Sequence, residues 1–264
     1  MRALVLIIIL LFGTTAVGQQ LKEITNSIGM KLVLIHPGSF TMGSPVGEVG
    51  RKVSESEHEV TISKSYYLGV YEVNQDEYEK VLGNNPSISK GANNPVQPES
   101  WFGAVSFCTK LSELPEEKAA GREFRLPTEA EWEYACRATS SAAYFFGDTA
   151  ELLEEYAWFG ERRGKTHPVG SKKPNRWGLY DMHGNVLEWC QDWYGHSSLG
   201  EATDPQGPRE GRHRVYRGGS WNNDAGSCQS AFRAAAAPSY RNNNHGFRVA
   251  MSLPSKQPET APSK

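Results

Sequence analysis

The residues of this chain that are best suited to chemistry lie between Asp181 and Tyr194, in the segment DMHGNVLEWCQDWY. Two carboxylates, Asp181 and Glu188, flank the pair Gly184-Asn185, which readily adopts the positive φ angles of a tight loop. In an extended chain, positions 184, 186 and 188 face one side, so two main-chain carbonyls and a carboxylate can converge. Oxygen ligands of this kind suit calcium. The segment predicts a structural calcium site with four ligands: Asp181, Gly184, Val186 and Glu188.

A simpler interpretation of the same segment is a polar turn that caps a strand and sends Trp189 and Trp193 into the core. His183, inside the turn, is interpreted as a structural residue. The 7 histidines of the chain show neither of the helical spacings, H-x-x-x-H or H-E-x-x-H, that hold zinc. The calcium site and the plain turn therefore both stay open, and no zinc centre is predicted.

The first 18 residues predict that the chain is exported. An apolar run from Ala3 to Phe12 precedes Ala16-Val17-Gly18, which fits the small-residue pattern that signal peptidase accepts. The run is too short to span a bilayer, and no later segment is apolar enough to do so. We expect residues 19–253 to form one secreted or periplasmic domain, and residues 254–264 to form a polar, disordered tail.

In an exported chain, the 4 cysteines predict two disulfides, with three possible pairings. Two of the cysteines fall on predicted helices, and the other two flank the second half of the chain, which is rich in Gly and Trp. We therefore favour the pairs Cys108–Cys136 and Cys190–Cys228.

The charges of the chain are balanced, with 28 Lys and Arg against 30 Asp and Glu and no basic block. This pattern lacks the positive patch that nucleic acid requires. We expect a monomer that neither binds nucleic acid nor spans a membrane. The 26 Gly, 7 Trp and 11 Tyr residues predict aromatic side chains that fix irregular loops, and little regular secondary structure.

The first half of the chain carries the clearest secondary-structure signals. Alternating apolar residues predict strands at 31–35, 39–42 and 60–73, and the polar segment 43–59 predicts a surface loop. Three helices are predicted from their capping residues: Asn74 to Leu82, Ser100 to Leu114, and Thr128 to Arg137. Thr128 and Glu131 form a capping box at the start of the third helix.

Several motifs, taken in their order along the chain, resemble the superfamily of the formylglycine-generating enzyme, or sulfatase-modifying factor. They are GMKLVLIHPGSFTMGSP at 29–45, RLPTEAEWEYACR at 125–137, WGLY at 177–180, GN at 184–185, RGGSW at 217–221 and GFRVAM at 246–251. The resemblance covers most of the chain after residue 28. It implies an α+β fold, namely a C-type-lectin-like domain enlarged by loops.

The same resemblance bears on the chemistry. In members that make formylglycine, two cysteines five residues apart follow the GGS-aromatic motif and bind copper(I), as suits paired soft thiolates. Here Cys228 matches the second cysteine, but Asn223 stands at the first, and Leu187 replaces the Trp that usually follows Gly-Asn-Val. Ser220 and Asn244 match polar positions of the family's active-site groove. An enzyme would thus be a formylglycine-generating oxidase or another oxidoreductase with altered metal ligation, using Cys228 and Ser220, and we expect no copper.

The second function class is a secreted binding or accessory module. Two polar loops flank a predicted strand that contains Phe232 and Arg233, so the loops can adjoin. Amides, Tyr and Arg give adaptable hydrogen bonds and aromatic contacts. We predict that the loops bind a protein, peptide or glycan through six residues: Trp221, Asn222, Asn223, Tyr240, Arg241 and Asn244. The alternative is that the asparagines only form turns, but Asn223 in place of a cysteine favours a binding module over an enzyme.

Overall fold

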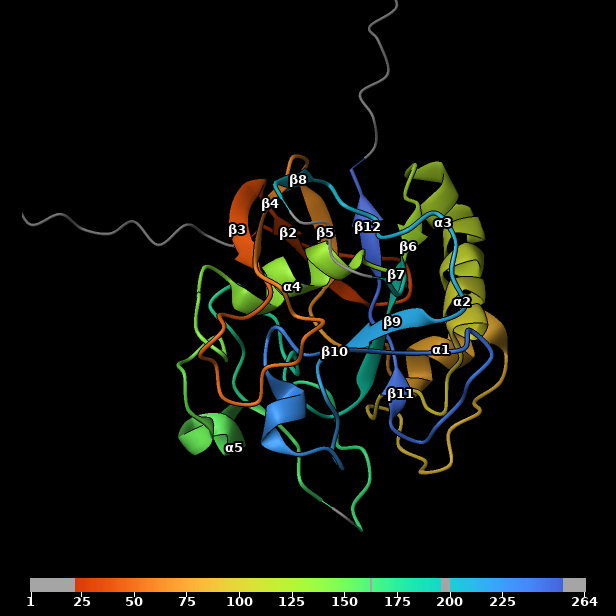
Figure 1. Ribbon diagram of the computed structural model, residues 1–264. Coiled ribbons are helices and arrows are strands. Elements are labelled where there is room, and N and C mark those ends of the chain that lie inside the picture. Colours follow the sequence, from red (N-terminus) through yellow and green to blue (C-terminus); the bar gives the residue numbers. More distant parts are fainter. Residues whose placement is uncertain (1–21, 162, 196–199, 254–264) are drawn as a thin grey trace, which may run out of the picture.

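A computed structural model describes residues 22–161, 163–195 and 200–253 of the chain (Figure 1). The predicted signal peptide and the predicted tail lie outside these residues. Helices and strands are mixed along the chain, and long loops connect them, as the composition predicts. Among the described residues, no helix has the length and apolarity that a membrane crossing needs.

The largest sheet has five strands in the order β1-β2-β5-β12-β6. Its strands are β1 (Glu23–Thr25), β2 (Lys31–Ile35), β5 (Tyr66–Gly69), β12 (Ala250–Ser252) and β6 (Phe124–Arg125). The late strand β12 lies between β5 and β6 and is antiparallel to both. The sheet therefore joins the two ends of the domain.

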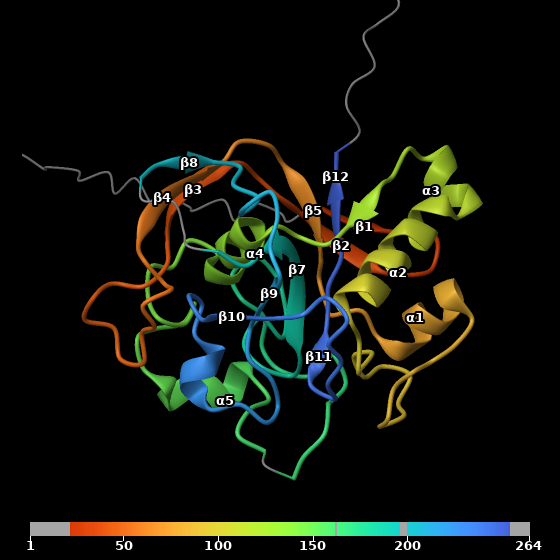
Figure 2. The ribbon, with the colours of Figure 1, turned by 45° about the vertical axis from the view of Figure 1, so that its right-hand side comes forward.

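A second sheet has the order β10-β9-β7-β11 and crosses the centre of the molecule (Figure 2). Its strands are β7 (Leu187–Trp193), β9 (Arg214–Arg217), β10 (Arg233–Ala236) and β11 (His245–Gly246). β11 is parallel to β7, and His245 pairs with Leu187. This pairing carries the Asn-rich segment before β11 to the turn before β7.

The third sheet has the order β3-β4-β8. Its strands are β3 (Gly38–Met42), β4 (His58–Ile62) and β8 (Ala202–Thr203). The prediction of one continuous strand at 60–73 is wrong. The segment forms two strands, β4 in this sheet and β5 in the largest sheet. The polar residues 63–65 separate the two strands, and the main-chain N–H of Ser63 donates to Asp204.

The three predicted helices are confirmed as α1 (Gln75–Leu82), α2 (Trp101–Glu113) and α4 (Glu129–Arg137). Asn74, Ser100 and Thr128 cap them as expected, and Thr128 forms the predicted capping box with Glu131. The remaining helices are short: α3 (Pro115–Ala119), η1 (Ala150–Leu152), α5 (Leu153–Tyr156) and η2 (Ala225–Cys228).

The core surrounds β7. Trp189 of β7 is fully buried, in a cluster with Phe107 of α2 and Phe247. Trp193, at the other end of the strand, is only half-buried and stacks on Arg214 instead. The interpretation that both tryptophans enter the core is therefore correct for one of them.

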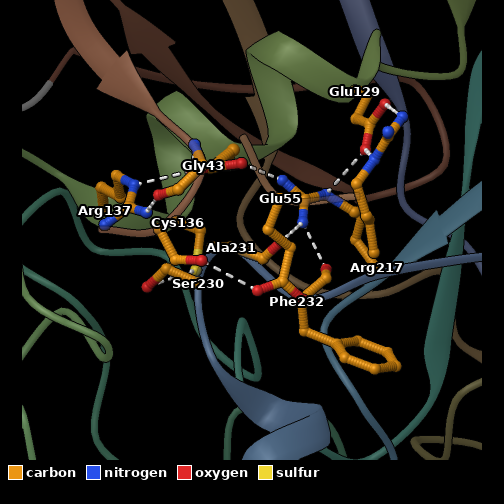
Figure 3. A network of polar contacts seen from close by, with 12 residues as sticks. Gly43, Glu55, Glu129, Cys136, Arg137, Arg217, Ser230, Ala231 and Phe232 are labelled. Carbon is orange, nitrogen blue, oxygen red and sulfur yellow. Dashed lines mark hydrogen bonds and ion pairs between the residues drawn. The ribbon is translucent and has the colours of Figure 1, made fainter. Parts of the chain in front are cut away.

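A network of buried charges joins α4 to the central sheet (Figure 3). Arg217 is fully buried; it donates to Glu133 and to the carbonyl of Ala231, and it lies 3.5 Å from Glu129. Arg233 makes a bidentate pair with Glu129, with N–O distances of 2.7 and 2.6 Å. Because each buried charge has a partner, the network fixes α4 against the strands that lead to the Asn-rich loops.

Candidate functional site

The turn before β7 has the predicted conformation. Asp181, Gly184 and Asn185 all have positive φ angles, of 57°, 99° and 58°. Gly184 is required there, because a Cβ atom would lie 2.3 Å from the carbonyl oxygen of Trp158. The Asn185 side chain is fully buried; it accepts from the N–H of His167 and donates to Glu72. The turn is therefore held from several sides.

The two carboxylates around this turn, Asp181 and Glu188, have different partners. Glu188 is fully buried and binds Arg248 through both oxygens, each at 2.6 Å, while one oxygen also accepts from Trp132 at 2.7 Å. Asp181 accepts from the N–H of Gly170 through Oδ2, but its buried Oδ1 has no partner. Burial raises the pKa of Asp181 to about 6.

These contacts test whether the four predicted ligands fit a calcium ion. The free oxygen of Asp181 suits a cation, but Glu188 does not, because both its oxygens are committed to Arg248. Among the described residues, no group of three or more His, Cys, Asp or Glu side chains could hold a metal. The arrangement as it stands does not fit calcium, and calcium binding stays a prediction from the sequence.

Chelation tests that prediction. Since Arg248 already supplies the charge opposite Glu188, we expect the melting temperature to be the same with and without a strong chelator. A ligand held only by the folded state adds about 3 kcal/mol at a hundredfold excess over its Kd, so its loss is measurable. A drop in melting temperature on chelation that is absent in Glu188→Gln would restore the calcium site.

The predicted disulfides are absent, and this expectation is corrected. All four cysteines are buried free thiols. Cys108 packs in the cluster around Trp189, whereas Cys136 and Cys190 pack in the cluster around α4 and Cys228 in a small third one. Each behaves as a small apolar core residue. Burial raises the pKa of Cys108 and of Cys136 to about 12, so neither is a thiolate at neutral pH.

Cys228, the candidate catalytic residue, lies under the domain surface. It is fully buried, and burial raises the pKa of its thiol. The backbone of Gly219, whose φ is 71°, packs directly on it, so a Cβ atom there would lie 2.5 Å from the sulfur. His183 donates from Nδ1 to the carbonyl of Cys228 at 2.7 Å, and burial lowers the pKa of His183 to about 3. The neutral imidazole is thus a structural partner, as predicted.

The position of the absent cysteine belongs to a network of side-chain amides. Ser220 Oγ lies 2.5 Å from Oδ1 of Asn223 and 2.8 Å from Oδ1 of Asn222. Asn244 donates to both Ser220 and Asn222, at 3.1 and 2.9 Å. The hydroxyl of Ser220 is buried and surrounded by amides, without a base beside it. It is therefore arranged as a structural hydrogen-bond centre and not as an activated nucleophile.

The two Asn-rich loops adjoin, as the sequence predicts. Besides the amide network, the Trp221 indole N–H lies 3.4 Å from the carbonyl of Asn243. We call residues 220–223 and 240–244 the amide surface. Tyr240 is 43% exposed and Arg241 is exposed, whereas Trp221 and Asn244 are buried beneath them. Two of the six predicted contact residues therefore support the surface and do not reach solvent.

Sequence reasoning missed one edge of this surface. The N–H groups of Gly160 and Glu161 donate to the carbonyls of Asn223 and Trp221, at 2.8 and 2.7 Å. His167 lies 2.8 Å from Glu161 and stacks on the ring of Trp158, with centroids 3.7 Å apart. These residues come from the loops before the predicted turn, where no motif marks them.

The surface loop 43–57 also borders this region. The Gln229 side chain donates to the carbonyl of Val49 at 2.8 Å, so the loop packs beside η2. Three of its valines, Val46, Val49 and Val53, are 87–89% exposed. Their apolar surface makes this loop a second place where a partner can bind.

Comparisons with known proteins agree with the motifs. The family model described as "Sulfatase-modifying factor enzyme 1-like domain" matches residues 19–253. The chain is 28% identical to the formylglycine-generating enzyme of Mus musculus, over 90% of the chain and 82% of that protein. It is 29% identical to "Chaperone protein LppX" of Paenibacillus barcinonensis, over 86% and 91%. The structure of Treponema denticola variable protein 1 superimposes with a TM-score of 0.79 and 30% identity, and covers 89% of this chain and 100% of that one. The fold is α+β and C-type-lectin-like, as expected.

Proposed function

Because the chain belongs to the sulfatase-modifying factor enzyme 1-like domain family, whose scaffold here has neither a thiolate pair nor an accessible thiol, we propose that it is a non-catalytic binding module. It uses the amide surface to hold a protein, peptide or glycan. We also propose that residues 1–18 export it to the periplasm or beyond.

One observation carries this proposal. The first copper position of the family holds Asn223, whose amide is bonded to Ser220, while Cys228 is buried beneath Gly219 with a raised pKa. Copper(I) prefers deprotonated thiolates, and an amide oxygen is a poor substitute for one. The position that would ligate the metal instead serves to shape a surface loop.

The character of the surface supports binding. The exposed side chains have fixed partners: Asn242 donates to the Tyr240 hydroxyl at 3.1 Å, and Arg241 lies 3.6 Å from the carboxylate of Glu99. Fixed aromatic and guanidinium groups lose little conformational entropy on contact, and such residues dominate many binding surfaces. Two of the similar proteins are named as a chaperone protein and a variable protein, which is compatible with binding by this scaffold.

The proposal is tested with a random-peptide display library and a glycan array, each probed with the purified domain. Ligands selected by the wild type should bind the double variant Tyr240→Ala/Arg241→Ala at least tenfold more weakly. Tyr240 is exposed, so its replacement should change the free energy of unfolding by less than about 0.5 kcal/mol. Arg241 also lies 3.6 Å from the fully buried Glu99, so urea unfolding of the double variant is measured beside its binding. Asn223 and Asn244 are left intact, because their amides support the loops.

The control is the double variant Val46→Ala/Val53→Ala in the loop 43–57, which removes exposed apolar groups outside the amide surface. We expect it to bind like the wild type. Loss of binding in the valine variant alone would place the site on that loop, and a complete lack of saturable ligands in both libraries would overturn the proposal.

A further inference from the structure

A pocket of about 330 Å³ lies against α2 and shares no lining residue with the amide surface. One face of the helix contributes Trp101, Val105, Cys108 and Thr109, and the opposite wall comes from Phe124, Leu126, Gln191 and Arg214. The helical residues recur at intervals of three and four, so they share one face. Small-molecule sites commonly have volumes of roughly 300 to 1,000 Å³, and this pocket lies at the small end of that range.

The pocket has an apolar floor. Phe124 and Leu126 are buried at its base, with 6% and 2% of their surface exposed. Val105 is only half-buried, because it lines this space. An apolar group of a ligand would therefore displace water from hydrocarbon surfaces, which is favourable by about 25 cal/mol per Å².

Two arginines line the pocket, Arg125 and Arg214; Arg125 is paired with Glu131, which leaves Arg214 as the cation for a ligand. The Arg214 guanidinium lies between two tryptophan rings, 3.9 Å from the centroid of Trp101 and 3.5 Å from that of Trp193. Nη1 donates to the carbonyl of Gln191 at 2.6 Å, whereas Nε is buried without a hydrogen-bond partner. The rings thus hold the cation in one orientation while leaving part of its hydrogen-bonding capacity unused.

The neighbouring acids do not neutralise Arg214. Within the described ranges, no carboxylate lies at ion-pair distance from it. Glu131 is engaged by Arg125 in a bidentate contact of 2.6 and 2.7 Å. An ionised Asp192 would raise the pKa of Arg214. Burial raises the pKa of Asp192 itself to about 8, so Asp192 is mostly neutral at pH 7.

We propose that this pocket binds a small apolar carboxylate, with the hydrocarbon part against Val105, Phe124 and Leu126 and the carboxylate on Arg214. A planar guanidinium suits a carboxylate, because the two can share parallel hydrogen bonds. A free acid and the C-terminal residue of a peptide both present this group, and the test below distinguishes the two sources.

The test uses the purified domain and three matched probes: 3-phenylpropionate, its neutral amide, and the tripeptide Gly-Gly-Phe with a free C-terminus. Tryptophan fluorescence reports binding, because Trp101 and Trp193 flank Arg214. We expect saturable binding of the acid, and at least tenfold weaker binding of the amide, as charged hydrogen bonds exceed neutral ones. Tighter binding of the tripeptide than of the free acid would identify a peptide terminus as the source, and the reverse would identify a free acid.

Two variants locate the site. Arg214→Met keeps the length of the stem and removes the charge, and should weaken acid binding at least tenfold. Val105→Phe fills the pocket without touching the arginine, and should block acid and amide alike even if Arg214→Met proves unstable. The double variant Tyr240→Ala/Arg241→Ala should bind the acid normally, which separates this pocket from the amide surface. Equal affinity for acid and amide, or no saturable binding of either carboxylate, would overturn the proposal.

Discussion

Replacing Arg217 with methionine is expected to lower the free energy of unfolding by about 3 kcal/mol or more, because removing one partner of a buried ion pair leaves the other charge uncompensated. Arg217 is fully buried, bonds Glu133, and lies 3.5 Å from Glu129. The loss falls at the lower end of the usual range of about 3 to 5 kcal/mol, since Arg137 and Arg233 remain on the two carboxylates. Urea unfolding of both proteins measures the difference.

The control for this prediction is an ion pair on the surface. Lys80 lies 2.7 Å from Asp76, and both side chains are about half exposed. Lys80→Met should change the free energy of unfolding by about 0.5 kcal/mol or less, as is usual for exposed pairs on a helix. If Arg217→Met costs no more than Lys80→Met, the buried network does not hold α4 to the sheet.

The second large effect is the contribution of Asp192 to stability, which is lost as the pH rises from about 4 to 8. Asp192 is buried, and burial raises its pKa to about 8, with the charge of Glu129 acting in the same direction and Arg233 opposing it. An unfolded aspartate releases its proton near its ordinary value of 3.8. Between these values the folded state binds more protons, so the free energy of unfolding falls with increasing pH. At about 1.4 kcal/mol per pKa unit, the fall between pH 5 and 8 is on the order of 2 to 4 kcal/mol.

Asp192→Asn should remove most of this pH dependence, because the amide resembles the protonated acid and can still accept from the N–H of Glu129. Asp181, with a pKa of about 6, acts in the same direction and leaves a smaller slope. Melting temperatures of both proteins at pH 5 and pH 8 provide the measurement. The lowered pKa values of His183 and His245 act in the opposite direction below about pH 6.5, so the difference between the two proteins is the test. If Asp192→Asn leaves the pH dependence unchanged, Asp192 is ionised in the folded protein.

Local signals predicted the early helices well, because their capping residues act within a few positions. Asn74, Ser100 and Thr128 each start the helix expected of them. The turn at Gly184-Asn185 was predictable for the same reason, since its conformation depends on residue types that tolerate positive φ. The adjacency of the two Asn-rich loops followed from the short strand expected between them.

Contacts between distant parts of the chain were not predictable in this way. Arg248 lies 60 residues from Glu188, and nothing near either residue in the sequence indicates their buried ion pair. The disulfide prediction failed because export was taken to imply oxidation, whereas the fold places the four cysteines in three separate clusters. The arginine held between Trp101 and Trp193 likewise joins three segments that only the folded chain brings together.

The central claim is that this scaffold binds without cysteine chemistry, and an assay for aldehyde formation tests it most directly. The purified mature protein is incubated with a peptide that carries the C-x-P-x-R sulfatase motif, together with copper(I) and a reductant, and the product is analysed by mass spectrometry. We predict no formylglycine, because Asn223 replaces one thiol and Cys228 is buried with a raised pKa. Formation of formylglycine that Cys228→Ala abolishes would contradict the account.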